Sequence, residues 1–281
     1  MNDQWRPKYH IGQDEFSIQY MSRTGATNMP RPHEHTCFEL YYLLNGERVY
    51  FMEDQVVTVR KGDLMIIHPH QLHSTASTEK MRFERILVNF SRSFVEQGDG
   101  QVAALLQAGG SRLVRIPLKD QPDVERLLQL MISECEREQP CYTSLVRTYL
   151  NELLIRIHRI ELSTHYKAAP DYEHPMHYKI TEIAQYMKAN YHQKLTLEQI
   201  AKQFYISPSY LSRTFTRLTG FHFREYLQTV RIREAQKRLV ESKDSVQMIS
   251  EQAGFEHIAH FNKTFKKIVG TTPLNYRKRH A

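Results

Sequence analysis

Four side chains in the N-terminal third of the chain have types and spacing that could bind a metal ion or a polar ligand. His33 and His35 are separated by one residue, Glu39 follows, and His73 lies further along the chain. Imidazole and carboxylate groups bind Zn, Ni, Mn or Fe, and they also donate and accept hydrogen bonds. On a β-strand, residues 33, 35, 39 and 41 would project to the same face. The spacing therefore predicts a polar site on one face of a sheet.

This polar set allows three interpretations. The residues His33, His35, Glu39 and His73 could hold a divalent metal, they could form hydrogen bonds with a small effector, or they could line a polar barrel mouth. Trp5 could stack on the apolar face of a sugar ring or anchor the preceding arm on the barrel. We favour a small-molecule effector, with a sugar as the first candidate. The expected effector site comprises Trp5, Arg31, His33, His35, Glu39, Tyr41 and His73.

A second kind of chemistry is predicted by an internal repeat in the C-terminal part. Residues 211–215 (LSRTF) return 50 positions later as residues 261–265 (FNKTF), and Gly220 returns as Gly270. Upstream of these segments, residues 200–201 and residues 249–250 are offset by 49 positions, which places a one-residue insertion at the turn. A repeated short helix, turn and helix predicts a duplicated helix-turn-helix with duplex DNA as its partner.

The repeat can be placed on helices with outward-facing residues. Thr196 and Ser207 are expected N-caps, and residues 197–203 form the supporting helix of the first unit. The buried sides are expected to carry Tyr210, Leu211, Phe215 and Leu218 in the first unit, and Ile258, Phe261, Phe265 and Ile268 in the second. The predicted DNA-binding residues are Ser209, Ser212, Arg213, Arg217, Ala259, His260, Asn262, Lys263 and Lys267.

These outward side chains suit recognition of base edges in the major groove. Arg and Lys pair with guanine, and Asn pairs with adenine. Residues 224–241 contain no Gly or Pro, so they can form one long helix that holds the two units at a fixed separation. Two recognition helices held in this way could enter successive major grooves about 34 Å apart.

Charge is divided unequally between the two halves. Residues 176–281 carry 18 Lys and Arg against 8 Asp and Glu, whereas residues 1–175 carry 20 against 23. The whole-chain excess of +7 therefore comes from the repeat-bearing half. An excess confined to one half predicts a polyanionic partner for that half, although a basic helical domain without such a partner would show the same balance.

The N-terminal half has the pattern of a small barrel or sandwich followed by helices. Short strands are expected at residues 38–44, 49–52, 56–59, 64–67 and 83–90. A helix is expected from about residue 120, and a second at 142–162 has an apolar stripe broad enough to pack on the barrel and also to contact a partner subunit. We therefore predict a homodimer.

The expected domains follow from these elements. Residues 1–162 form the sensing domain, in which about 120–162 is a helical dimerisation segment, residues 163–176 form a linker, and residues 177–281 form the DNA-binding domain. The chain has three cysteines without metal-site pairing, a polar start, and no apolar run of membrane-spanning length. We expect a cytoplasmic protein with no membrane partner.

The C-terminal motifs carry a family resemblance. The signature is Ile249-Ser250-x-x-Ala253-Gly254-Phe255, followed by Phe261-x-x-x-Phe265-Lys266-x-x-x-Gly270-x-x-Pro273-x-x-Tyr276-Arg277. With it, residues 178–279 resemble the DNA-binding domain of the AraC/XylS family of bacterial transcription regulators, and the outward residues fall where that family contacts bases. The His-x-His, Glu and distant His set resembles the cupin pattern found in many sensor domains of this family.

The resemblance implies an α+β fold, in which an N-terminal cupin-like β-barrel and its helices are linked to an all-α domain with two helix-turn-helix units. It also implies a sequence-specific transcriptional regulator controlled by a small effector, and sugar-responsive members of the family point to a sugar. RNA polymerase would be a further partner of an activator, but the direction of regulation is not encoded in the sequence.

The first unit departs from the family pattern in its turn. It has Tyr205 where relatives commonly have glycine, which the second unit keeps as Gly254. A non-glycine residue at this position must either accept a left-handed backbone or reshape the turn.

Two other classes of function are weaker interpretations. A cupin-type metalloenzyme with an accessory DNA-binding domain would depend on the His and Glu set alone, without a Ser or Cys nucleophile motif or a glycine-rich phosphate loop. An architectural DNA-binding protein would have no use for an elaborate sensing barrel. We therefore expect a regulator rather than an enzyme.

Overall fold

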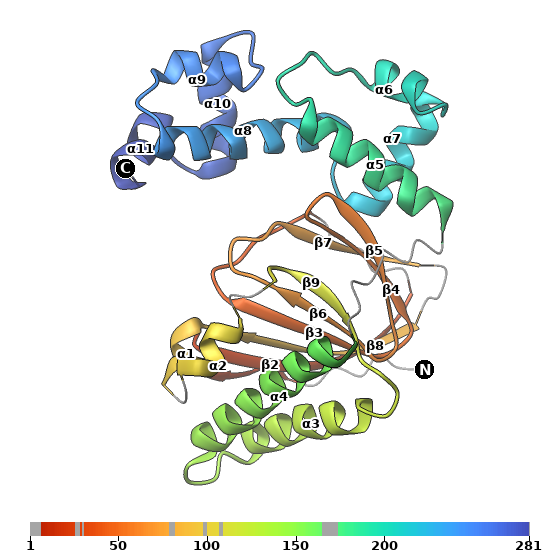
Figure 1. Cartoon of the computed structure of the whole chain (residues 1–281), viewed down its shortest axis with the longest axis vertical. Coiled ribbons are helices and arrows are strands. Elements are labelled where there is room, and N and C mark those ends of the chain that lie inside the picture. Colours follow the sequence, from red (N-terminus) through yellow and green to blue (C-terminus); the bar gives the residue numbers. More distant parts are fainter. Residues whose placement is uncertain are drawn as a thin grey trace. The chain divides into compact units, whose positions relative to one another are not determined.

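The computed structural model describes residues 7–25, 29, 31–78, 82–97, 100–106, 109–164 and 174–280. The chain separates into two compact units, Met1–Glu173 and His174–Ala281 (Figure 1). The first unit combines antiparallel sheets with helices, and the second is all helical. The predicted α+β class is confirmed.

The N-terminal unit contains a barrel of two antiparallel sheets. The six-stranded sheet has the order β1-β2-β8-β3-β6-β9, and the three-stranded sheet has the order β5-β4-β7. The strands are β1 (Tyr9–Ile11), β2 (Phe16–Thr24), β3 (Phe38–Asn45), β4 (Glu47–Met52), β5 (Gln55–Arg60), β6 (Asp63–Ile67), β7 (His73–Ser77), β8 (Arg82–Phe90) and β9 (Arg112–Arg115). The five predicted strands are present, but β1, β2, β7 and β9 were not predicted.

The two faces of the six-stranded sheet pack against different partners. On β8, Ile86 and Val88 are fully buried against the helices, whereas Phe83 belongs to a separate cluster between the two sheets. Residues of both sheets contribute to that second cluster, for example Tyr41 of β3 and Tyr50 of β4. Strand alternation therefore gives the barrel an outer apolar layer and an inner layer that includes polar groups.

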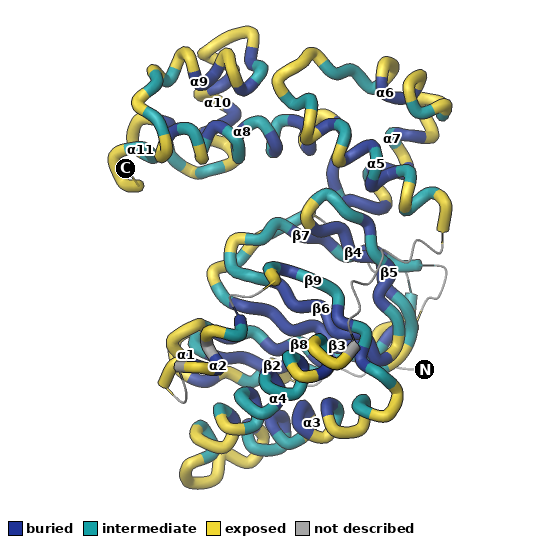
Figure 2. Tube along the Cα trace, viewed as in Figure 1, coloured by how far each residue is buried: buried dark blue, intermediate teal, exposed yellow. Residues whose placement is uncertain are grey.

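The described residues of this unit also form the helices α1 (Arg92–Glu96), α2 (Gly100–Leu105), α3 (Gln121–Arg137) and α4 (Tyr142–Thr164). The last two pack on the outer face of the six-stranded sheet and show their buried sides in Figure 2. The apolar stripe of α4 is used almost completely inside the unit, because Val146, Leu150 and Leu153 are fully buried while Leu145 is exposed. The stripe does not leave a broad apolar face for a partner subunit.

Residues 174–280 of the C-terminal unit form the helices α5 (Pro175–Ala189), α6 (Leu197–Gln203), α7 (Pro208–Thr219), α8 (Phe223–Glu241), α9 (Val246–Gln252), α10 (Ile258–Val269) and α11 (Pro273–His280). Helices α6–α7 and α9–α10 are the two helix-turn-helix units, and α8 connects them (Figure 1). The predicted caps are present, since Thr196 forms a reciprocal capping box with Gln199 and the Ser207 side chain accepts a hydrogen bond from Tyr210 N.

Both units end their second helix in the same way. Gly220 caps α7 with φ of 75°, and Gly270 caps α10 with φ of 81°. The turn inside each unit is also left-handed, with φ of 56° at Tyr205 and 81° at Gly254. The tyrosine therefore accepts the left-handed backbone instead of reshaping the turn.

Candidate effector site and DNA interface

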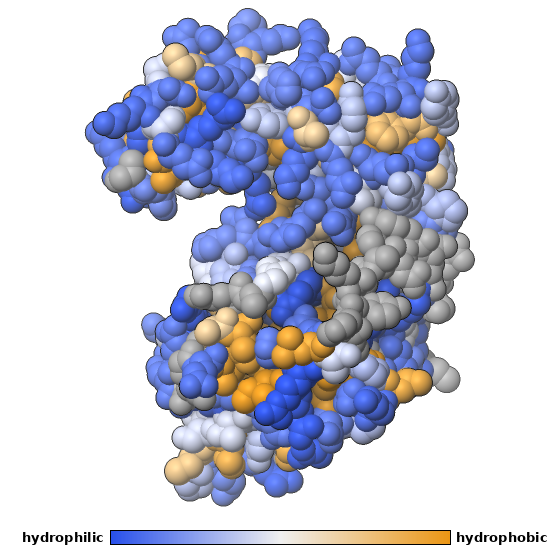
Figure 3. All heavy atoms as spheres, in the orientation of Figure 1, coloured by the Kyte–Doolittle hydropathy of each residue, from blue (hydrophilic) through white to orange (hydrophobic). Residues whose placement is uncertain are grey.

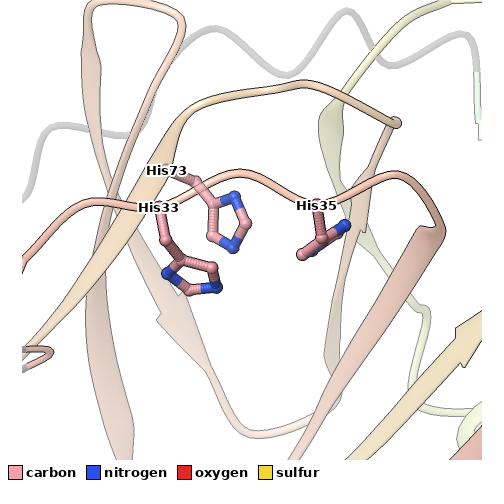
Figure 4. Close-up of side chains that lie close together, drawn as sticks. All are labelled: His33, His35 and His73. Atoms are coloured by element: carbon pink, nitrogen blue, oxygen red, sulfur yellow. The ribbon is translucent and has the colours of Figure 1, made fainter. Parts of the chain in front are cut away.

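Three histidines of the barrel lie together through backbone pairing. His33 and His73 form an isolated antiparallel bridge, in which each backbone N–H donates to the other residue's carbonyl oxygen at 3.0 Å. His70 N also donates to His35 O at 2.7 Å. One ring nitrogen from each of His33, His35 and His73 lies within 4.8 Å of the others (Figure 4). The segment before β3 is thus held against the start of β7.

Glu39 lies beside this histidine group on the inner face of β3. One carboxylate oxygen is 3.3 Å from His35 Nε2, and the other is 3.9 Å from His73 Nε2. Only 6% of Glu39 is exposed. The structure therefore brings the four predicted residues together, and we call them the His/Glu cluster.

These residues do not come together on one strand. The expectation that residues 33, 35 and 39 lie on one strand fails, because β3 begins at Phe38 and His35 lies outside any strand. Pro32 lacks an N–H for a regular ladder at this edge. Pairing across the chain with β7, which sequence periodicity did not predict, brings His33 to the cluster instead.

Backbone carbonyls fix the orientation of two imidazole rings. His35 Nδ1 donates to Cys37 O at 2.8 Å, and His73 Nδ1 donates to Gln71 O at 2.9 Å. Since a carbonyl oxygen only accepts, both Nδ1 atoms carry hydrogen, and both Nε2 atoms face Glu39. This arrangement resembles the outer hydrogen bonds that orient histidine ligands in metal sites.

The charges in the cluster are strongly coupled. Contact with Cys37 and then with Glu39 raises the pKa of His35 to about 10. Burial favours the neutral form of Glu39, but the hydrogen bond from His35 and the charge of His73 outweigh burial and lower the pKa of this carboxyl. Burial lowers the pKa values of His33 and His73. At neutral pH the cluster therefore contains a His35–Glu39 ion pair beside two neutral imidazoles.

The other predicted effector residues are distributed differently. Tyr41 is on the inner face with only 4% of its surface exposed, and burial raises its pKa to about 12. Arg31 is exposed, so it lies outside the buried group. Trp5 lies outside the described residues. The sequence interpretation missed Arg48 and Arg85, which no local pattern distinguishes from solvent-exposed arginines of a strand.

The predicted DNA-binding residues lie on the solvent-facing sides of α7 and α10. All of them are exposed except Ser212, which is partly buried. The basic residues among them, such as Arg213 and Lys263, occupy equivalent positions in the two units. Figure 3 shows that the visible surface of this helical unit is mainly hydrophilic, whereas hydrophobic atoms gather over the strands of the barrel beside α4.

Three residues expected on the buried sides of these helices are exposed. Tyr210, Ile258 and Ile268 each have 40% of their surface exposed. Tyr210 and Ile258 lie in the first turn of their helices, and Ile268 lies in the last, so the supporting helix does not cover them. Thr214 and Thr264 are buried instead, because they share the helical face of Phe215 and Phe265.

Comparison with known proteins agrees with this architecture. The profile of the AraC-like ligand-binding domain matches residues 20–154, and a helix-turn-helix domain profile matches residues 200–279. A sensing barrel joined to a paired helix-turn-helix is the organisation of a ligand-responsive transcriptional regulator. The chain belongs to the AraC/XylS family of such regulators.

Relatives are similar over most of the chain. The uncharacterized transcriptional regulator YfiF of Bacillus subtilis is 24% identical over 87% of this chain and 78% of its own length. The transcriptional activator RhaR of Escherichia coli is 22% identical over 87% of this chain and 86% of its own length. Among solved structures, ToxT from Vibrio cholerae is 12% identical, with 97% of this chain and 100% of that chain covered and a TM-score of 0.39.

No helix within the described residues combines the length and the apolar character needed to span a bilayer.

Proposed function

We propose that the chain binds operator DNA in a base-dependent manner through α7 and α10, under the control of a small effector bound inside the barrel. The observation that carries this proposal is the set of exposed residues at matched positions of the two recognition helices. Arg213 and Lys263 are expected to contact guanine, and Asn262 is expected to contact adenine. Because Ser212 stands where the second unit has Asn262, the two half-sites should differ in sequence.

Helix α8 and the loop before α6 hold the two helix-turn-helix units in a fixed relation within the C-terminal domain. Arg231 of α8 donates from Nε to Tyr191 O and from Nη2 to Gln193 O, both at 2.8 Å. Lys194 of the same loop pairs with Glu256 of the second unit at 3.1 Å. This connection supports simultaneous entry of both helices into successive major grooves, about 34 Å apart.

The effector that we propose is a small hydroxyl-rich molecule, with a sugar as the first candidate. The His/Glu cluster and Tyr41 offer donors and acceptors for hydroxyl groups. Effector binding would favour one arrangement of arm, barrel and interdomain contacts and so change how the DNA-binding domains meet the operator.

The finer features of this proposal concern assembly and location. We propose a homodimer that acts in the bacterial cytoplasm, where its DNA partner lies, and that contacts RNA polymerase if it activates transcription. Its relatives are transcriptional regulators, and we propose no catalytic activity for this chain. Since the α4 stripe is buried, the dimer contact would have to use the polar surface of the helices around Leu145.

The same cluster also fits a divalent transition metal. The fixed Nδ1–H groups of His35 and His73 leave Nε2 as the ligand atom, which on His35 would have to lose its proton to the metal, and Glu39 supplies carboxylate oxygens between them. With His33 this gives three nitrogen donors and one oxygen donor, a set suited to Zn, Ni, Mn or Fe. When bound, such a metal would offer open positions to effector oxygens.

Two experiments test the proposed function. Footprinting on selected duplexes in excess competitor DNA should show two protected patches that depend on base order, and a single patch or sequence-independent protection would contradict it. Thermal unfolding with a panel of sugars and divalent metals, together with elemental analysis of the purified protein, tests the barrel. Glu39→Ala should abolish effector-induced stabilisation, and an unchanged shift in this variant would place the effector elsewhere.

A further inference from the structure

Two arginines lie on the inner face of the barrel, beyond the His/Glu cluster. Arg48 projects from β4, the middle strand of the three-stranded sheet. Arg85 projects from β8, an inner strand of the six-stranded sheet. Arg48 is only 4% exposed, and its guanidinium lies 4.5 Å from the ring centroid of Phe83. It donates to the hydroxyls of Ser77 at 2.9 Å and Thr75 at 3.0 Å, which are neutral partners. Two neutral hydroxyl groups thus contact a positive charge inside the barrel.

Arg85 is less completely satisfied than Arg48. Its Nη2 donates to Gln19 Oε1 at 3.4 Å, near the limit of a hydrogen bond, and its guanidinium lies 5.5 Å from the Tyr41 ring centroid. Its Nη1 is buried and has no hydrogen-bond partner among the described residues. Among the same residues, no carboxylate lies within ion-pair distance of Arg85. Leaving such a donor buried and unpaired is unfavourable.

Solvent reaches the inner face where Arg85 lies. Along the central strand β8, Arg85, Leu87 and Asn89 are partly exposed, whereas the alternating residues Ile86 and Val88 are completely buried on the outer face. Hydrogen-bonded strands flank β8 on both sides, so this exposure must open toward the interior of the barrel. Part of the Arg85 side chain is therefore open to the interior of the barrel, while its Nη1 stays buried.

Glu39 forms no ion pair with Arg85 among the described residues. Both carboxylate oxygens of Glu39 face His35 and His73. Burial is the main reason that the pKa of Arg48 is lowered, and the nearby charge of Arg85 contributes to the same effect. The two guanidinium groups therefore raise each other's free energy, and a bound anion would offset that cost.

We infer that Arg85, supported by the charge of Arg48, forms a binding subsite for the anionic group of the effector. A guanidinium matches a carboxylate or phosphate by two parallel hydrogen bonds. This inference rests on the proposed effector role of the barrel and specifies the chemical class: a small polar molecule that carries an acidic group, such as a sugar acid. The acidic group would lie at Arg85, and hydroxyl groups would lie at the His/Glu cluster.

The spacing along the sheet is compatible with one small ligand. Glu39 is paired with Asn89, and Arg85 lies four residues before Asn89 on the same face of β8. Four residues of a strand span about 13 Å between Cα positions. The Arg85 guanidinium lies 5.5 Å from the ring centroid of Tyr41, which is paired with Leu87, so this side chain extends toward Glu39.

Thermal unfolding of the full chain with matched probe pairs tests the inference. The pairs are D-galacturonate with D-galactose and D-glucuronate with D-glucose, at equal ionic strength, with D-glucose 6-phosphate as the phosphate probe. An acidic probe should raise Tm more than its neutral partner. Arg85→Gln should weaken binding of the acid about ten- to hundredfold, because a charged hydrogen-bond partner is lost. Equal shifts within every pair, including no shift from either member, would overturn the inference.

Three further variants make the outcome specific. Arg82→Gln removes an exposed arginine from the same strand and should leave the preference for acids intact. Arg85→Lys keeps the charge without the paired donors, so it should retain part of the preference and serves if Arg85→Gln does not fold. Glu39→Gln tests the effector role itself. If it abolishes binding while the preference for acids survives Arg85→Gln, the proposed function stands and the anion subsite is wrong.

Discussion

The two helix-turn-helix units have the same turn geometry but different residues at its left-handed position. In the first unit Ile206 N donates to Ala201 O at 3.0 Å, and in the second Phe255 N donates to Ser250 O at 3.1 Å. The turn that contains Tyr205 and the turn that contains Gly254 therefore have the same backbone hydrogen bond. The hydrogen bonds of the turn fix its conformation, and they do so with or without glycine.

The surroundings of the turn explain why only one unit keeps glycine. A Cβ atom at Gly254 would lie 2.8 Å from His192 O and 2.9 Å from Tyr191 O. Tyr205 instead is 93% exposed. Glycine is therefore required where another backbone approaches closely, while the left-handed backbone alone is a cost that the first unit tolerates.

The largest effect should come from filling the space at Gly254. Gly254→Ala should lower the free energy of unfolding by about 3 kcal/mol, because a left-handed alanine is strained and its Cβ must displace the 191–192 backbone. Calorimetry of the full chain would measure the loss. The matched Tyr205→Ala variant should change the free energy of unfolding by no more than about 0.5 kcal/mol. Similar losses in both variants would show that the surroundings do not distinguish the units.

The recognition helices provide a second test of the comparison. Arg213→Ala and Lys263→Ala should each remove about 2 kcal/mol of base discrimination, in different half-sites. Competition binding with duplexes altered in one half-site at a time would measure this effect. If either variant lost affinity equally for selected and random DNA, the assignment of that residue to a base contact would be wrong.

Relief of strain at the first turn should produce a smaller effect of opposite sign. Tyr205→Gly should raise the free energy of unfolding by about 0.5–1 kcal/mol, since the left-handed cost disappears while the unfolded chain gains some freedom. Thermal unfolding of the full chain is again the measurement. A loss of stability would mean that the tyrosine side chain contributes contacts that outweigh its backbone strain.

The smallest expected change concerns two residues that we propose to face the phosphate backbone. Arg217→Ala and Lys267→Ala, at equivalent positions, should each weaken binding to all sequences alike. Each should reduce the slope of log affinity against log salt by about 0.9. Titrations at several salt concentrations would measure the slope, and a change confined to one DNA sequence would reassign that residue to base recognition.

The helix-turn-helix domain could be predicted in more detail than the barrel. Its signals are local and occur twice, so the boundaries of α6 and its Thr196 cap follow from the sequence. The errors at Tyr210, Ile258 and Ile268 arise at helix ends, where the periodic pattern does not reveal whether a neighbouring helix extends far enough to cover the side chain.

The barrel is held together by contacts between residues that are far apart in the sequence. Such contacts could not be predicted from local sequence patterns. Strand alternation placed Glu39 and Tyr41 on one face, but the pairing of His33 with His73 needs a register that no local pattern contains. Arg48 and Arg85 were missed for the same reason, since isolated arginines in strands are usually solvent-exposed. Only the facing of the two sheets shows that these arginines point inward.

The bridge between His33 and His73 has a mechanical consequence for signalling. The chain before β3 is hydrogen-bonded to β7 through Met29 and His33, and to His70, which precedes β7, through His35. His33 and His35 also supply imidazole groups to the cluster. A bound molecule that draws those rings inward must pull the attached backbone with it. The backbone around His33 and His35, between β2 and β3, would therefore move when the cluster is occupied, so a reporter attached to this segment is expected to register binding.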